Sequence, residues 1–219
     1  MEKAKDGGSK IVIKKFYIIA VLLFFAGYVN ISADINEVCD KLSKNNIVKG
    51  NFIQRKEAAA VKRIFVSTGN FVIAKDLGII LQTLTPVSST LIAGPNSLTQ
   101  RNDSGVQSRI DAKGNRSFLW IAETISSIFT GDITTLQKSF FVEFIESNGE
   151  WVMNLTPKHR EMKAFAEKVI IKGGESSGRH VINEVTMIEQ KSGSTELFFY
   201  ESVFPEMLTP DEIQLFETN

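Results

Sequence analysis

The chain has 219 residues, enough for one domain or at most two. Its 25 basic and 25 acidic residues balance, which argues against a broad nucleic-acid-binding surface. One Cys and two His exclude a disulfide framework and a Cys-rich zinc site. The 16 Phe outnumber three Tyr and two Trp. Since Phe brings apolar surface without a polar group, this composition indicates an unusually apolar interior.

The N-terminal segment has the pattern of an export signal. Lysines precede an uncharged run over residues 16–33, whose apolar part ends at Val29. This apolar part is shorter than the span of about 20 residues that a transmembrane helix needs. We therefore predict a signal peptide over residues 1–33, cleaved after about Ala33, and export to the periplasm. An uncleaved membrane anchor is the alternative.

A short helix and then strands are predicted after the signal. Residues 34–45 read as a helix that Asp34 can cap. Cys39 on this helix is expected to be a small buried residue rather than a partner in an interchain disulfide. The period then changes to two, and strands are predicted over residues 47–56, 62–68, 70–74, 78–84 and 89–93, with turns at 68–70, 75–78 and 94–96. The pattern of residues 97–110 is polar and ambiguous, and it favours a hairpin around residues 103–105.

Helices are predicted in the middle of the chain. Residues 118–129 carry one apolar stripe at helical spacing, and residues 132–138 form a second short helix after Gly131. Further strands are predicted over residues 140–146, 151–155, 164–172, 179–190 and 195–202, with turns at 148–149, 173–174 and 192–194. A capping box of Thr209 and Glu212 begins a final helix over residues 209–217.

These elements define a mainly β (α+β) fold in one domain over residues 34–219. It has about ten to eleven antiparallel strands, an N-terminal helix and central helices. A sheet of this width normally curls or closes, so we expect a barrel-like sheet.

Motifs of the common catalytic sites are absent from the sequence, which contains no G-x-S-x-G, H-E-x-x-H, GxGxxG or P-loop. His159 and His180 have no carboxylate at useful spacing. Glu143 and Glu146 lie three residues apart on one strand and so face opposite sides. Glu184 lies among apolar strand residues, and we expect it at a strand edge or at the barrel mouth. The sequence therefore predicts no enzyme, no cofactor and no metal site.

Local motifs, in their order and spacing, resemble those of the LolA-like outer-membrane lipoprotein carriers. The resemblance covers residues 34–204 and rests on the following segments, together with the apolar stripe of the central helix: Gly50-Asn51-Phe52-Ile53-Gln54, Gly69-Asn70-Phe71, Thr85-Pro86, Leu91-Ile92 before Gly94, Leu155-Thr156-Pro157, and Met187-Ile188-Glu189-Gln190 before the strand Glu196 to Tyr200. The chain is identified as a divergent member of the family.

The resemblance implies an unclosed barrel whose central helices form a lid over an apolar cavity. The residues that we expect to bind lipid in this cavity are Phe52, Phe71, Ile73, Ile79, Leu81, Leu91 and Phe144 from strands, and Ile121, Ile125, Ile128 and Phe129 from the helix. Family members commonly carry Arg-Pro after the second strand of this region, where this chain has Lys75 and Asp76. Lys75 supplies the charge of the family's lid-holding Arg but not its planar fork.

The resemblance also implies a function. The protein is expected to be a monomeric periplasmic carrier that shuttles acylated lipoproteins from an inner-membrane ABC-type transporter to an outer-membrane receptor or to the outer membrane itself. No nucleic acid partner is expected. Two alternatives remain open: a carrier or sensor of another envelope lipid, such as a glycolipid carrier or an envelope-stress regulator, and an anchored structural envelope protein without cargo.

Overall fold

The computed structural model describes residues 34–111, 124, 126–163, 166–189 and 193–217. Eleven antiparallel strands in these ranges form one sheet. The strands are β1 (Ile47–Ala58), β2 (Arg63–Ala74), β3 (Gly78–Thr85), β4 (Ser89–Ala93), β5 (Ser97–Asn102), β6 (Gly105–Asp111), β7 (Phe140–Ser147), β8 (Glu150–Pro157), β9 (Lys168–Ser176), β10 (Arg179–Glu189) and β11 (Gly193–Val203). The helices are α2 (Ile35–Leu42), the 3₁₀ turn η1 (Ala59–Val61), α4 (Ile133–Ser139), α5 (Arg160–Lys163) and α6 (Pro210–Glu217), and residues 126–130 are also helical.

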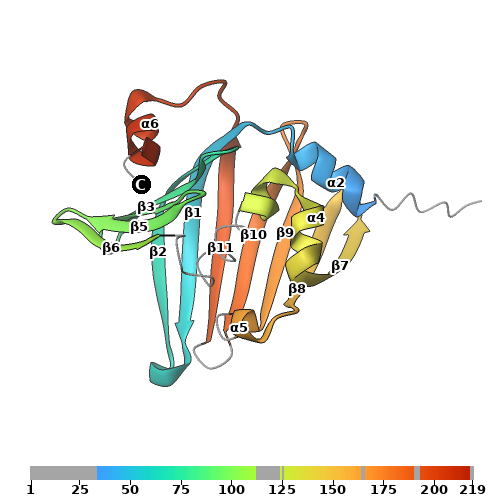
Figure 1. Cartoon of the computed structure of the whole chain (residues 1–219), viewed down its shortest axis with the longest axis horizontal. Helices are drawn as coiled ribbons and strands as arrows, with labels where there is room; N and C mark the ends of the chain where they lie inside the picture. The colour runs from blue at the N-terminus through green and yellow to red at the C-terminus, as the bar shows by residue number, and fades with distance from the viewer. Residues whose placement is uncertain (1–33, 112–123, 125, 164–165, 190–192, 218–219) are drawn as a thin grey trace, which may run out of the picture. The chain divides into compact units, whose positions relative to one another are not determined.

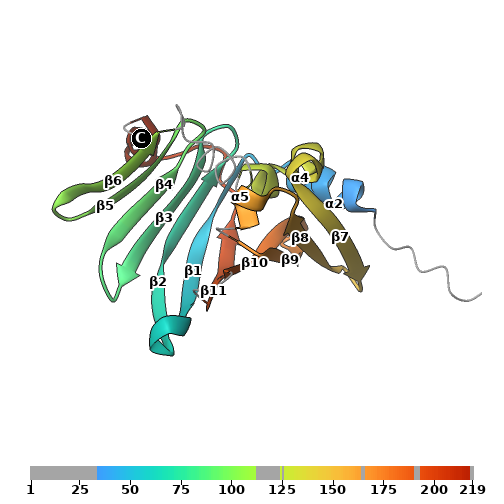
Figure 2. The same ribbon diagram turned by 60° about the horizontal axis from the view of Figure 1, so that its bottom comes forward.

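The sheet consists of two meanders joined at its centre. Its strand order is β6-β5-β4-β3-β2-β1-β11-β10-β9-β8-β7, so neighbours in the sheet are neighbours in the chain except at the β1–β11 pair. The two edge strands, β6 and β7, do not pair with each other. The sheet is strongly bent, as Figure 2 shows. The predicted unclosed antiparallel barrel is therefore confirmed.

One side of the bent sheet holds the main core. The helices α2, α4 and α5 pack on this side, in front of the strands in Figure 1. Val38 and Leu42 of α2 and Leu136 of α4 join strand residues such as Phe52 in one buried cluster. We call this side the inner face. Cys39 of α2 is 2% exposed, as expected of a small buried residue, and burial raises the pKa of its thiol to about 11.

Two of the predicted turns lie inside strands instead. Residues 68–70 belong to β2, and a Cβ atom at Gly69 would lie 2.0 Å from the carbonyl oxygen of Gln82 on β3. Residues 173–174 belong to β9, where Gly173 leaves room for the indole ring of Trp151. Both Gly69 and Gly173 are thus required by a close approach within the sheet. The turn after β9 is at Ser177-Gly178, where both residues have positive φ.

The turns predicted at residues 75–78, 94–96 and 148–149 hold with small shifts of strand ends, whereas β11 already begins at Gly193, inside the turn predicted at 192–194. Asn148 and Gly149 join β7 and β8 with φ angles of 56° and 79°, as a two-residue hairpin requires. β5 and β6 form the hairpin expected around residues 103–105. The helix α5 was not predicted; it ends at Lys163, directly before the strand predicted over residues 164–172, which the structure replaces with β9 from Lys168.

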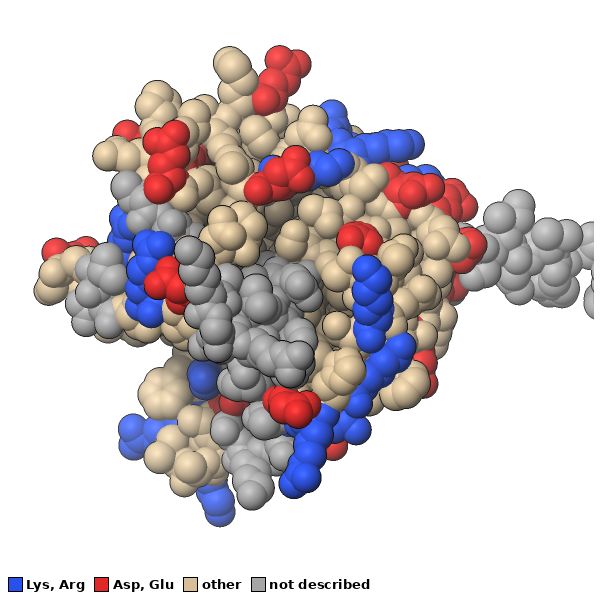
Figure 3. Space-filling view, viewed as in Figure 1, with Lys and Arg blue, Asp and Glu red and all other residues tan. Residues whose placement is uncertain are grey.

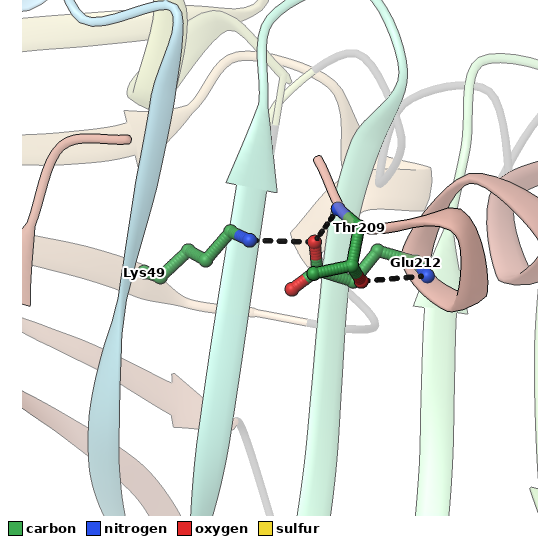
Figure 4. Close-up of polar contacts among 3 residues, drawn as sticks. All are labelled: Lys49, Thr209 and Glu212. Carbon is green, nitrogen blue, oxygen red and sulfur yellow. Dashed lines mark hydrogen bonds and ion pairs between the residues drawn. The ribbon is translucent and has the colours of Figure 1, made fainter. Parts of the chain in front are cut away.

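The C-terminal helix α6 covers the opposite, outer face of the sheet. A row of cross-strand neighbours on this face runs from Lys49 through Val72, Ile80 and Ile92 to Thr99. Ile80, Ile92 and Thr99 are at most 3% exposed, although they point away from the inner face. Lys49 Nζ lies 2.5 Å from Glu212 Oε2 of α6, which places the helix on the side of this row (Figure 4).

Glu212 also completes the predicted capping box. Its carboxylate accepts a hydrogen bond of 2.7 Å from the backbone N–H of Thr209, and its own N–H donates to Thr209 Oγ1 at 3.3 Å (Figure 4). Burial alone would raise the pKa of this carboxyl, but hydrogen bonds from Lys49 and Thr209 outweigh it and hold the pKa below the usual 4.5. One carboxylate therefore both caps α6 and attaches it to β1.

The Lys49–Glu212 ion pair is expected to make stability depend on pH. Because the pKa of Glu212 is depressed in the folded state, the pair stabilises the protein fully above about pH 4.5, and this contribution is lost as pH falls through the lower, folded-state pKa. Glu212→Gln keeps an acceptor for the cap but removes the charge. It should reduce the free energy of unfolding by about 1–2 kcal/mol at pH 7 in urea titrations. A difference between variant and parent that stays constant down to pH 3 would contradict this assignment.

Candidate functional site

The inner face is apolar over most of the sheet. Strand register aligns Phe71 of β2 with Leu81 of β3 and Leu91 of β4. A second row crosses the other half of the sheet, from Gln54 through Leu197, Val185, Ile171 and Met153 to Phe144. Because side chains alternate between the faces of a strand, each row lies entirely on the inner face. The inner side chains of both meanders therefore face the same space.

An open cavity of about 650 Å³ lies on this inner face. Its lining residues come from β1, β3, β4, β5, β7 to β11, α5 and the helical residues around 128, and most are apolar: Phe52, Gln54, Leu81, Thr83, Ser89, Leu91, Gln100, Thr124, Ile128, Phe140, Pro157, Met162, Ala166, Val169, Val185, Met187, Glu189, Thr195 and Leu197. Ligand pockets in proteins typically measure about 300–1,000 Å³. The cavity is thus large enough for a sizeable apolar ligand.

Four of the residues predicted from the sequence line this cavity, namely Phe52, Leu81, Leu91 and Ile128. Phe52 is fully buried in the sheet centre, and Ile128 reaches the cavity from the helical segment 126–130. The structure therefore brings residues of β1, β3, β4 and the helical segment 126–130 together at one cavity. Ile121 and Ile125 lie outside the described residues.

The remaining predicted residues belong to the inner core beside the cavity. Phe71 and Phe129 both pack edge-to-face on Phe199, with ring centroids 5.0 and 5.9 Å away. Ile73 and Ile79 are buried and line, with Phe129, a small hollow of about 40 Å³. Phe144 is half-buried and pairs with Met153. The part of the inner face around Phe71 and Phe199 is filled by its own side chains.

Lys75 lies in the turn between β2 and β3, at the rim of the small hollow. Its Nζ donates a hydrogen bond of 3.1 Å to the carbonyl oxygen of Ser43, the residue after α2. A cation at the C-terminal end of a helix is favourable because the last carbonyl groups carry partial negative charge. Lys75 therefore ties the β2–β3 turn to the helix that packs over the inner face.

A polar end of the cavity was missed by the sequence reasoning. Gln54, Thr83, Ser89, Glu189 and Thr195 line it. Thr195 Oγ1 lies within hydrogen-bond distance of Glu189 Oε1, at 3.3 Å, and Lys56 Nζ lies 3.9 Å from the same oxygen.

A spacing of two residues could have revealed this polar end. Each of its polar lining residues lies two positions along its strand from an apolar lining residue: Phe52 and Gln54, Leu81 and Thr83, Leu91 and Ser89, Met187 and Glu189, Leu197 and Thr195. Residues so spaced share one face of a strand. The cavity is therefore apolar in its middle and polar toward one end of the strands.

The ionisable residues that the sequence singled out do not meet at this cavity. Glu184 lies on the outer face, where its carboxylate is 2.9 Å from Lys172 Nζ. The backbone carbonyl of His180 accepts a hydrogen bond from Asn45, and burial, helped by Lys41, lowers the pKa of its imidazole. In the described ranges, no group of His, Cys, Asp and Glu side chains is arranged to hold a metal ion.

An unclosed antiparallel sheet that curves around an apolar cavity, with helices on its inner face, is the LolA-like open-barrel architecture. Residues 43–214 match the model of the family described as outer membrane lipoprotein carrier protein LolA, and the chain belongs to this family. No curated protein sequence gives a significant match.

Solved structures with a similar fold share little sequence with this chain. They include the MucA/MucB complex of Pseudomonas aeruginosa (11% identity, 83% of this chain and 61% of that chain, TM-score 0.46) and a LolA superfamily protein of Nitrosomonas europaea (12%, 82% and 96%, 0.41). A third is a putative outer membrane lipoprotein-sorting protein domain of Vibrio parahaemolyticus (10%, 83% and 97%, 0.42). This chain spans about three-fifths of the length of the chain that it matches in the MucA/MucB complex.

Proposed function

We propose that the protein carries the acyl chains of lipoproteins in its inner cavity, between the inner and the outer membrane. The observation that supports this most is the cavity itself, of about 650 Å³ and lined mainly by apolar side chains. The family's description as a lipoprotein carrier agrees with it. In this proposal an inner-membrane ABC-type transporter loads the protein, and an outer-membrane receptor or the membrane itself accepts the cargo.

The energetics favour acyl chains as the ligand. Each methylene removed from water contributes about 0.8 kcal/mol, so a cavity that covers part of one or two chains binds them strongly. The polar end then faces the linkage between acyl chains and peptide, where the amide and hydroxyl groups of Gln54 and Thr195 offer hydrogen bonds. Strong binding also means that release must be coupled to a second event, such as movement of the helices or transfer to a better acceptor.

The proposal includes export. A carrier of this kind works in the periplasm, and residues 1–33 would be its cleaved signal. None of the helices in the described part of the chain is long and apolar enough to cross a bilayer.

Native mass spectrometry of protein purified from the envelope fraction tests both parts. We expect a mature mass that begins near Asp34 and a population with bound diacyl or triacyl lipopeptide. A chain that retains residues 16–29 would contradict the soluble shuttle. Bound glycolipid without lipopeptide would instead identify a carrier of another envelope lipid.

Lys75 is expected to influence cargo release more than cargo binding. Lys75→Leu removes the hydrogen bond to Ser43 and so loosens the β2–β3 turn from α2. Because Lys75 is exposed, the loss of stability should stay below about 1 kcal/mol. The transfer rate of a fluorescent acyl probe to acceptor vesicles should change, while equilibrium binding of the probe stays close to that of the parent. Lys44→Leu, an exposed neighbour of the same helix end, is the control. An unchanged transfer rate in Lys75→Leu would show that this contact has no part in release.

A further inference from the structure

The hairpin of β1 and β2 projects beyond the strand pairs that flank it, and Gly193 at the start of β11 lies against its base at Glu57. Pairing of β1 with β11 extends to Lys56, and pairing of β2 with β3 begins at Thr68. In the described sheet, residues 63–67 of β2 therefore pair only with β1. Figure 1 shows this hairpin as the lowest part of the molecule, with η1 at its tip. We call residues 57–67 the projecting hairpin.

Apolar side chains are exposed on every side of the projecting hairpin. Val61 at the tip is 58% exposed, and Ile64, Phe65 and Val66 are 57%, 53% and 51% exposed. Register places Phe65 opposite Lys56 on the inner face, whereas Ile64 and Val66 lie on the outer face. A folded protein partner usually covers one face of such a hairpin. A lipid phase surrounds it, and so covers both faces and the tip together.

Positive charge accompanies this apolar surface. Arg55 and Lys56 precede the hairpin tip and Lys62 and Arg63 follow it, whereas Glu57 is the one acidic residue between positions 55 and 67. Arg55 lies 3.6 Å from a carboxylate of β11, and Lys56 lies 3.9 Å from a carboxylate of β10. Lys62 and Arg63 are exposed, and neither forms an ion pair within the described ranges. In Figure 3, blue side chains lie among tan ones at the lower left of the molecule.

We propose that the projecting hairpin docks the protein on anionic lipid bilayers. Val61, Ile64 and Phe65 enter the boundary between headgroups and acyl chains, and Lys62 and Arg63 contact lipid phosphates. Apolar side chains flanked by Lys and Arg are the combination that binds membrane surfaces, through buried apolar area and attraction to anionic headgroups. The exposed Tyr200 and Phe141 lie on other strands, β11 and β7.

The position of the hairpin gives this docking a direction. Gln54 lines the polar end of the cavity, and Lys56 follows it on the same face of β1. Continuing along β1, the chain reaches the hairpin tip within a few residues, each of which advances about 3.3 Å. Docking therefore brings the polar end of the cavity toward the bilayer surface. The docking itself does not depend on the cargo and goes beyond the proposed carrier function.

A fluorophore placed at the tip tests the proposal. Val61→Cys in the full chain is labelled with an environment-sensitive dye. Cys39 should not compete for the label, because it is buried and its pKa is raised to about 11. Vesicles that contain phosphatidylglycerol should raise the emission several-fold, and a quencher attached to the lipid chains should reduce it. Because the dye reports its own surroundings, membrane binding through residues 16–29 does not imitate this signal.

Two controls make the result specific. A dye on Ser147→Cys, at the exposed end of β7 and distant from the hairpin in Figure 1, should not respond to vesicles. Charge reversal by Lys62→Glu with Arg63→Glu should weaken vesicle binding of the tip at least tenfold, as should about 1 M salt.

Three outcomes would overturn the proposal. The tip dye does not respond to anionic vesicles, or it responds equally to purely zwitterionic vesicles and charge reversal does not change this response. In the third outcome, the dye responds to protein concentration alone. The last outcome would assign the hairpin to contacts with a second copy of the chain. Circular dichroism of each variant confirms the fold, and because the substituted positions are exposed, folding should be unaffected.

Discussion

Tryptophan at both Leu91 and Met187 should nearly abolish binding of an acyl probe while the protein stays folded. The two residues line the cavity from opposite halves of the sheet, so two indole rings would occupy space that the ligand needs. Displacing two to four methylenes of the ligand costs about 2–3 kcal/mol, which weakens binding about 30- to 150-fold. Thermal unfolding should change little, because the rings enter existing space. Probe titration and calorimetry measure the two effects.

The neighbouring residues on the same strands provide the control for this variant. Thr90→Trp and Ile188→Trp place the same ring on the outer face, where probe binding should be unaffected. If this part of the inner face were instead a packed core, the two Trp substitutions would destabilise the protein, because overpacking costs about 1–3 kcal/mol per site. A large loss of stability in Leu91→Trp with Met187→Trp, or normal probe binding, would therefore count against the carrier.

Gly173→Ala is expected to destabilise the protein strongly. A Cβ atom at this position would lie 2.0 Å from Cζ2 of Trp151 and 2.4 Å from the carbonyl oxygen of Val181. The indole is 1% exposed and held by the core, and the carbonyl belongs to the adjacent strand, so neither can move freely. We expect a loss of about 3 kcal/mol or more in the free energy of unfolding, measured by urea titration.

Gly174→Ala, one residue further along β9, is the matched control. The nearest atom to a Cβ there is 3.5 Å away, which is ordinary contact, so the stability should change by less than about 1 kcal/mol. Trp151→Phe in the Gly173→Ala background isolates the clash. The two substitutions should be non-additive by about 1–3 kcal/mol, because the smaller ring relieves the contact. Additive losses would show that Gly173 is required for another reason.

The two-residue period explains why most of the fold could be predicted. Alternation places Phe52 and Gln54 on one face of β1, and Leu81 and Thr83 on one face of β3, whatever the tertiary structure, and the structure brings all four to the cavity. Asn148-Gly149 and the capping box of Thr209 and Glu212 are local signals, since the residues that form them are close in sequence. Such features need no knowledge of the rest of the chain.

The wrong predictions arise where residues that are distant in the sequence determine the local structure. Gly69 and Gly173 read as turns because the local sequence does not show that Gln82 or Trp151 lies against them. The polar lining was overlooked because only apolar residues were considered for an apolar cavity, although Gln54 and Glu189 follow the same alternation. Which apolar inner residues leave a space and which fill it, as Phe71 does against Phe199, depends on packing across the sheet.

The pairing of β1 with β11 determines when this protein can fold. Asn51 of β1 pairs with Tyr200 of β11, so the pair at the centre of the sheet joins strands from opposite ends of the domain. Contacts of such high sequence separation form slowly, because a long loop must close before they form. The first meander cannot gain its central neighbour until residues near position 200 have been synthesised. The chain therefore remains without a complete sheet during translation, which is the condition that passage of an unfolded chain through a membrane pore requires.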